Sequence, residues 1–149
     1  MSATPMNLAV WRVSAPDFDV DAFLAEFPRV ASEVVSWRRG EVRVGRRGVH
    51  EDSGFRITIA DAETFPEAFE DVRAFFSTRE IVLLLEALHA RGISSVLDLG
   101  VDVGSPQRFA AYLRFSTADL QWLARLGVVL EISAYPASED DDEPDDTSE

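Results

Sequence analysis

The chain has 149 residues and no cysteine, so its length is typical of one domain, and disulfides and thiolate metal sites are excluded. Its formal net charge is −13, but eight acidic residues and no basic ones lie at 139–149, which leaves −5 (−13 + 8) for residues 1–138. We therefore expect a mildly acidic domain followed by a strongly acidic tail.

Three segments are expected from the distribution of apolar and charged residues: a flexible N-terminus at 1–6, a single α+β domain at 7–136, and a disordered acidic tail at 137–149. The tail has no apolar residue with which to fold from Ser138 onward. Met1–Pro5 has no signal-peptide pattern, and no apolar run approaches the roughly 20 residues that span a bilayer. We expect a cytoplasmic protein with no membrane partner.

Three strands and one short helix are expected in the first 60 residues: strands at 7–14, 33–44 and 55–60, and a helix at 20–27. Pro16 ends the first strand. Asp17 or Asp19 caps the helix, and Pro28 stops it. The second strand is expected to turn or bulge near Gly40, followed by a loop at 45–54.

A long helical region follows, beginning at the capping-box sequence Thr64-Phe-Pro-Glu67 and ending at Gly92. It carries two apolar stripes that are out of phase by roughly 140° at about 100° per residue. A second S-x-x-E sequence begins at Ser77, where the phase changes. We therefore predict two consecutive helices with a break near Ser77. The stripes are Phe65, Phe69, Val72, Phe76 and Ile81, Leu84, Leu85, Leu88.

The last third predicts a strand at 97–103, a helix that Ser116 caps and Gly127 ends, and a final strand at 128–134. The element order predicts an α+β fold, with a ferredoxin-like βαββαβ core and a C-terminal αβ extension. Because several strands alternate cleanly, we expect a mainly antiparallel sheet with helices on one face.

The end of this domain resembles a known family. Leu113-Arg-Phe-Ser116, a helix with Leu120, Leu123 and Leu126, and a Leu-Gly-Val turn into a strand closing on Tyr135 are similar to the C-terminal signature of a family of small bacterial domains of unknown function. The similarity spans most of residues 7–135. Members occur near polymorphic toxin systems, and some are regarded as immunity proteins. The resemblance implies a protein partner and supplies no catalytic residues.

Two acidic clusters have residue types that could bind a metal ion. Asp17, Asp19 and Asp21 have the 1, 3, 5 spacing of a calcium loop, but its sixth and twelfth positions are Ala22 and Pro28, so helix capping is favoured. The run at 50–52, His-Glu-Asp, is favoured as a solvated loop because adjacent side chains converge poorly on one ion. With two histidines, no cysteine and no nucleophile motif, we expect no metal, no cofactor and no enzyme activity.

The basic segment, Arg38–Arg47, holds five of the fourteen basic residues within ten positions. An anion site or an acidic partner surface would use it, whereas a solvated hairpin enriched in arginine by codon bias is the alternative. Nucleic acid is disfavoured because the acidic chain repels phosphate. The candidate partner-binding or anion-binding residues are Trp37, Arg38, Arg39, Arg43, Arg46 and Arg47.

Two functions remain open. The first is a non-catalytic cytoplasmic interaction protein, an immunity protein that binds and neutralises a cognate toxin through an open sheet face or an edge strand. The second is a small-molecule or anion-binding sensor module that uses the basic segment. The acidic tail is either a solubilising terminus, a counter-charge to these arginines, or part of a surface for a basic target.

Overall fold

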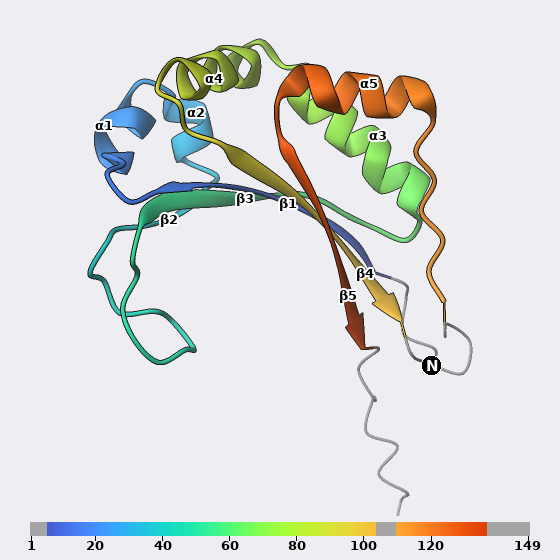
Figure 1. The fold of residues 1–149 in the computed structure, drawn as a ribbon, viewed down its shortest axis with the longest axis horizontal. Coiled ribbons are helices and arrows are strands. Elements are labelled where there is room, and N and C mark those ends of the chain that lie inside the picture. Colours follow the sequence, from blue (N-terminus) through green and yellow to red (C-terminus); the bar gives the residue numbers. More distant parts are fainter. Residues whose placement is uncertain (1–5, 104–109, 137–149) are drawn as a thin grey trace, which may run out of the picture.

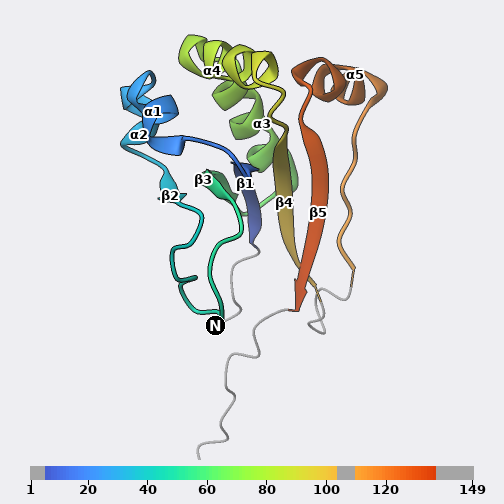
Figure 2. The same cartoon turned by 60° about the vertical axis from the view of Figure 1, so that its left-hand side comes forward.

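The structure, a computed structural model, describes residues 6–103 and 110–136. Figures 1 and 2 show a five-stranded sheet in the order β2-β3-β1-β4-β5, with the helices gathered on one face. The elements in chain order are β1 (Asn7–Ala15), α1 (Val20–Ala25), α2 (Pro28–Ala31), β2 (Val35–Trp37), β3 (Ser53–Ala62), α3 (Phe65–Phe76), α4 (Arg79–Ala90), β4 (Ser95–Val103), α5 (Thr117–Leu126) and β5 (Val129–Pro136).

The predicted α+β class with a mainly antiparallel sheet is confirmed, since β4–β5 is the only parallel pair among the described strands. The expected acidic tail at 137–149 and all but the last residue of the expected flexible N-terminus lie outside the described residues. Within the described part of the chain, the longest helices have 12 residues, and no helix is long and apolar enough to cross a membrane.

Strand β1 occupies the centre of the sheet because its alternate residues are apolar and its two edges pair with β3 and β4. Its inward side chains face the helices and are fully buried, Trp11 among them. The Trp11 ring meets Phe55, Phe75 and Phe76 edge-on, with centroid distances of 5.9, 5.8 and 5.4 Å. This aromatic cluster joins β1 and β3 to α3, so the helix-facing side of the sheet is the core.

The predicted break between two helices is confirmed, since α3 ends at Phe76 and α4 begins at Arg79. The prediction of a second capping box beginning at Ser77 is wrong. Ser77 donates its hydroxyl to the carbonyl of Arg73 at 2.6 Å and thus belongs to the end of α3. The Glu80 carboxylate instead accepts the backbone N–H of Val30 at 3.3 Å, which ties α4 to α2.

The first helical region differs from the prediction in one respect. Of the two expected caps, Asp17 and Asp19, it is Asp19 that caps α1, and its carboxylate accepts the backbone N–H of Ala22 at 3.1 Å. Pro28 does not simply stop the helix, because it occupies the first turn of a second short helix, α2, where its missing N–H is not needed.

The predicted strand at 33–44 is wrong beyond Trp37. Only Val35–Trp37 pairs with β3. The chain then turns at Gly40, whose φ of +90° favours glycine, and Val42 keeps a single bridge to Val49. Residues 38–52 consequently form a long loop below the sheet instead of extending it (Figure 1).

The C-terminal extension is placed by local signals in the chain. Ser116 and Asp119 form a reciprocal capping box at the start of α5, and Gly127, with a φ of +68°, ends it and leads into β5. Arg73 of α3 holds α5 in place, because its guanidinium pairs with Asp119 and lies 4.8 Å from the ring centroid of Trp122. The crossover through α5 therefore lays β5 parallel to β4 at the edge of the sheet.

Candidate anion-binding groove

The sheet face opposite the helices carries no helix in Figure 1. Two arginines of the central strands, Arg12 and Arg56, line the groove on this face. Arg12 of β1 and Arg56 of β3 are cross-strand partners in the antiparallel register, and Val96 of β4 lies on the other side of Arg12. Like charges placed directly opposite each other on a sheet are unfavourable. The pair therefore concentrates positive charge at one point of the open face.

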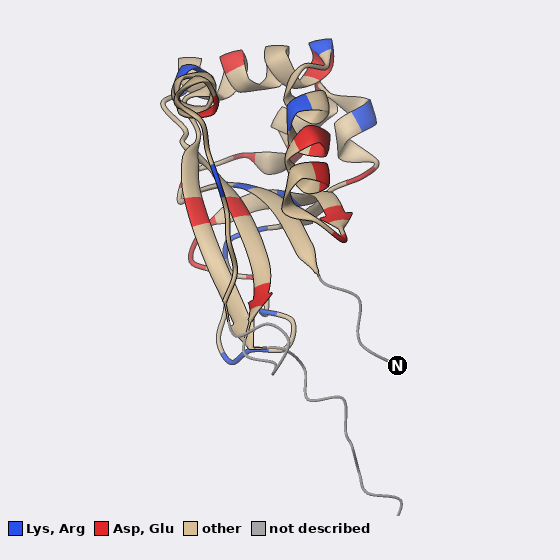
Figure 3. Cartoon of the chain, turned by 90° about the vertical axis from the view of Figure 1, so that its right-hand side faces the viewer, with Lys and Arg blue, Asp and Glu red and all other residues tan. Residues whose placement is uncertain are grey.

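The loop at 38–52 faces this part of the sheet and encloses a groove of about 660 Å³, which we call the arginine groove. Its lining includes four arginines and two acidic residues, giving it a net charge of +2 in a chain whose total is −13. Figure 3 shows basic positions at the tip of the loop. The four arginines are Arg12, Arg43, Arg46 and Arg56, and the two acidic residues are Glu41 and Asp52.

One wall of the groove is the indole of Trp37, which is fixed from three sides. Its Nε1–H donates to Asp52 Oδ1 at 2.9 Å, and its ring stacks on His50 with a centroid distance of 5.6 Å and an interplanar angle of 23°. Gly54 makes room beneath it, since a Cβ there would lie 2.8 Å from Trp37 Cζ2. The groove thus presents a rigid aromatic surface beside its arginines.

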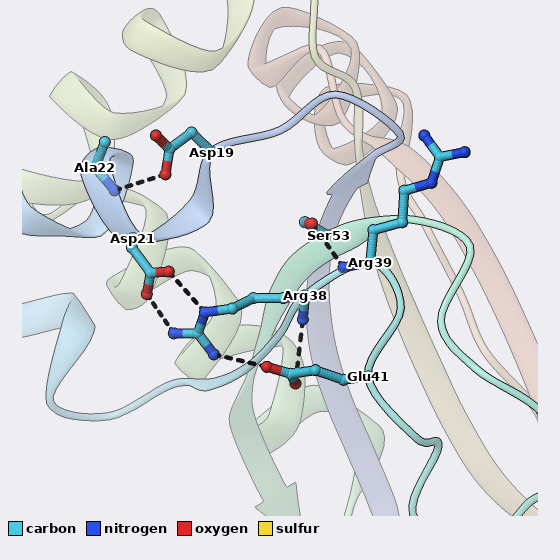
Figure 4. A network of polar contacts seen from close by, with 7 residues as sticks. All are labelled: Asp19, Asp21, Ala22, Arg38, Arg39, Glu41 and Ser53. Atoms are coloured by element: carbon cyan, nitrogen blue, oxygen red, sulfur yellow. Dashed lines mark hydrogen bonds and ion pairs between the residues drawn. The ribbon is translucent and has the colours of Figure 1, made fainter.

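Arg38 serves the architecture of the loop and does not line the groove. Figure 4 shows its guanidinium between two carboxylates: its Nε donates to Asp21 Oδ2 at 2.6 Å, and its Nη1 donates to Glu41 Oε1 at 3.2 Å. The bond from Arg38 lowers the pKa of Asp21, and the two carboxylates raise the pKa of Arg38. Arg38 therefore fastens the loop to α1.

The neighbouring Arg39 is held by its backbone, whose N–H donates to Ser53 Oγ at 2.9 Å. Its side chain points away from the Arg38 network in Figure 4. Neither Arg39 nor Arg47 is among the residues that line the groove.

The structure thus divides the six residues singled out in the sequence. Trp37, Arg43 and Arg46 line the arginine groove, whereas Arg38, Arg39 and Arg47 do not. Sequence reasoning missed Arg12 and Arg56, which lie far apart in the chain. The available signal was their outward position in strands whose alternate residues are apolar.

The charges of these arginines are unequally compensated. Arg12 donates to Glu131 Oε2 at 2.9 Å and lies 3.7 Å from Asp98 Oδ2, on the side of the sheet toward β5. Within residues 6–103 and 110–136, Arg43, Arg46 and Arg56 make no ion pair. Guanidinium groups bind carboxylates and phosphates through paired N–H donors. In the part of the chain that the structure describes, the groove therefore has three guanidinium groups without an ion-pair partner.

The acidic clusters considered as metal sites have other contacts. Asp19 caps α1 and Asp21 pairs with Arg38, while His50 and Asp52 both contact Trp37. Across the described part of the chain, His, Asp and Glu form no group of three or more that could hold a metal ion.

Comparisons of the chain with protein-family models, with curated proteins and with solved structures find no match in any of the three. The family resemblance of residues 113–135 therefore stays a prediction.

Proposed function

We propose that this protein acts by binding and not by catalysis, and that the arginine groove is a site for an anionic ligand. The observation that carries the proposal is the convergence of Arg43, Arg46 and Arg56 on one groove without ion pairs among the described residues. The chain keeps this basic site although its net charge is −13. Carboxylate and phosphate groups are the chemistry that such a site recognises.

The electrostatics of the open face also support an anion. Arg12 is already paired with Glu131, whereas its cross-strand partner Arg56 makes no ion pair among the described residues, so a bound anion would compensate the charge of Arg56. The volume of about 660 Å³ falls within the roughly 300–1,000 Å³ of small-molecule sites. Trp37 adds a flat apolar surface on which part of a ligand can lie. The groove therefore fits a small polyanion or a short acidic peptide.

The test is the thermal shift of the purified chain with three probes: inorganic pyrophosphate, ATP and penta-aspartate. We compare the wild type with the groove variant Arg43→Gln/Arg46→Gln and with the control Arg39→Gln/Arg47→Gln, which removes the same charge from the same loop. A ligand at 100 times its Kd stabilises by about 2.7 kcal/mol. We expect the groove variant to bind at least tenfold more weakly and the control to bind within threefold of the wild type.

The probes also separate the sources of negative charge. A shift with pyrophosphate and ATP but not with penta-aspartate identifies a phosphate site, and the reverse identifies a carboxylate site. The proposal is wrong if none of the probes shifts the wild type, or if the groove variant and its control lose affinity equally.

A second candidate function, the binding and neutralisation of a toxin by an immunity protein, rests on the outer edge of the sheet, where β5 has no further strand beside it among the described residues. On edge strand β5, Val129, Ile132 and Tyr135 are 48%, 52% and 44% exposed. Exposed apolar side chains along a long edge strand are typical of a partner-binding surface. We propose this edge as the docking site for such a partner, in keeping with the resemblance of residues 113–135.

Its test is co-purification from the native host followed by mass spectrometry. The variant Ile132→Lys places a charge on the edge, and Val82→Lys places the same charge on α4, where Val82 is 40% exposed. We expect a toxin-like partner with the wild type and Val82→Lys but not with Ile132→Lys. Recovery of the same proteins with all three chains would exclude the edge as the docking site.

We further propose that the elements from β1 to β4 follow a ferredoxin-like βαββαβ plan, to which α5 and β5 are added. The antiparallel pairing of β1 with both β3 and β4, and of β2 with β3, supports this assignment. The cytoplasmic location expected from the sequence stays a prediction.

A further inference from the structure

We propose that the chain carries an internal competitor for its own arginine groove: the acidic segment 139–146. This inference rests on the proposed function, because a groove that binds no anion would not hold the segment. It extends that function by identifying what an external ligand must displace.

Charge complementarity is the first argument. Seven of the eight residues at 139–146 are acidic and none is basic. The groove has a net charge of +2, and three of its arginines make no ion pair among the described residues. Elsewhere on the described surface the acidic side chains outnumber the basic ones, so the groove is where a carboxylate-rich segment is attracted most strongly.

Distance is the second argument. Val96 pairs with Val129 and Val103 with Pro136, so the groove lies seven positions, or about 23 Å, along the sheet from the end of β5. Strand β3 is three strands away from β5, which adds about 14 Å across the sheet. The direct path is therefore about 27 Å, whereas the ten residues from Pro136 to Asp146 span up to about 33 Å when extended.

The shape of the loop shortens this path. Figures 1 and 2 show the tip of the loop at 38–52 at the same end of the molecule as the end of β5. Arg43 and Arg46 belong to that loop, and both line the groove. They are the arginines that the segment would reach first.

Attachment to the same chain makes even a weak contact effective. A short flexible connection gives a local concentration in the roughly millimolar range. The contact is electrostatic between exposed groups, so it weakens when added salt shortens the screening length below about 8 Å. The segment thus lowers the apparent affinity of the groove for other anions, and a ligand binds by displacing it.

The absence of cysteine allows a direct test on the full chain. Ser148→Cys creates a single thiol, to which a nitroxide spin label is attached. The spin label broadens the signals of nearby backbone amides, and NMR on ¹⁵N-labelled protein measures this broadening. We expect broadening at Val35 and Arg46, near the groove, and none at Leu83 on the helical side. A mixture of spin-labelled chains at natural isotope abundance with ¹⁵N chains that carry no spin label measures the broadening caused by contacts between molecules, and this contribution is subtracted.

Two matched variants carry the same spin label. One replaces the seven acidic residues of 139–146 with Asn or Gln, and the other is Arg43→Gln/Arg46→Gln. We expect both to abolish the broadening near the groove, whereas Arg39→Gln/Arg47→Gln preserves it. The neutralised segment should also raise the affinity for the anion that binds, measured with pyrophosphate or penta-aspartate, by at least threefold.

The outcomes separate this inference from the function on which it rests. If the signals near the groove broaden no more in the wild-type chain than in the neutralised variant, the internal competitor is overturned. This holds even when external anions bind and Arg43→Gln/Arg46→Gln abolishes their binding. Broadening that requires Arg43 and Arg46 supports the competitor, even when no external probe binds, in which case the proposed function fails alone.

Discussion

Gly54 lies where β3, β1 and the wall of the groove meet, and replacing it tests the packing described there. A Cβ added to Gly54 would overlap the backbone carbonyl oxygen of Val13 and lie 2.8 Å from both Ser14 Cβ and Trp37 Cζ2. Overpacking of this kind costs about 1–3 kcal/mol and occasionally more. Because a backbone atom of the central strand cannot swing aside, we expect Gly54→Ala to destabilise by about 3 kcal/mol.

Gly100→Ala provides the matched control on the same face of the sheet. Its Cβ would lie 2.9 Å from Tyr135 Cε2, but this ring belongs to a residue that is 44% exposed and can rotate away. We expect a loss below about 1 kcal/mol, since alanine also restricts the unfolded chain.

Urea unfolding followed by tryptophan fluorescence measures both variants, with the midpoint shifting and the slope unchanged. At about 2–4 °C per kcal/mol, the Gly54→Ala melting temperature should fall by roughly 6–12 °C. Equal stability losses for Gly54→Ala and Gly100→Ala would show that Gly54 is not packed against the β1 backbone. The packing of Trp37 against Gly54 would then be wrong.

Three further changes test other parts of the fold. Leu84→Ala, at a fully buried position of α4, should cost about 2–5 kcal/mol, whereas Leu83→Ala, at a side chain that is 44% exposed, should cost less than about 1 kcal/mol in the same urea assay. Ser116→Ala should lower the unfolding free energy by about 1 kcal/mol because it removes one bond of the α5 capping box, and a loss of helicity without a stability change would contradict this. Arg38 lowers the pKa of Asp21 in the folded state, so their interaction is fully present above the unfolded pKa of about 3.9 and is lost as the pH falls through the lower folded pKa. Melting curves from pH 6 to pH 2 should therefore show Asp21→Asn less stable than the wild type at pH 6 and converging with it at low pH, and a constant gap would refute the pairing.

The parts of the fold that follow local rules were predictable from the sequence. The helix break near Ser77 follows from the phase of two apolar stripes, which depends only on residues within a few turns of each other. The caps at Asp19, Thr64 and Ser116 are local for the same reason.

The failures involve long-range structure. Val42 and Val44 suggested a strand, but they are 76% and 98% exposed, and among the described residues the single bridge from Val42 to Val49 is the only strand-like pairing of this segment. The role of Arg12 and Arg56 depends on a cross-strand register between residues 44 positions apart, which no local pattern encodes. Three of the six residues singled out in the sequence therefore line the groove, and the two arginines of the sheet become apparent only in the three-dimensional arrangement. That these residues bind a partner or an anion stays a prediction.

The central position of β1 has a consequence for the order of events during synthesis. Ala9 pairs with Leu99, which lies 90 positions later in the chain. One edge of β1 therefore stays unpaired until most of the chain has been synthesised. At about 5–20 residues per second, that wait lasts roughly 5–18 s. During this interval the tryptophan-bearing strand that later anchors the core has an unpaired edge, and the nascent chain is at its most vulnerable to association with other chains.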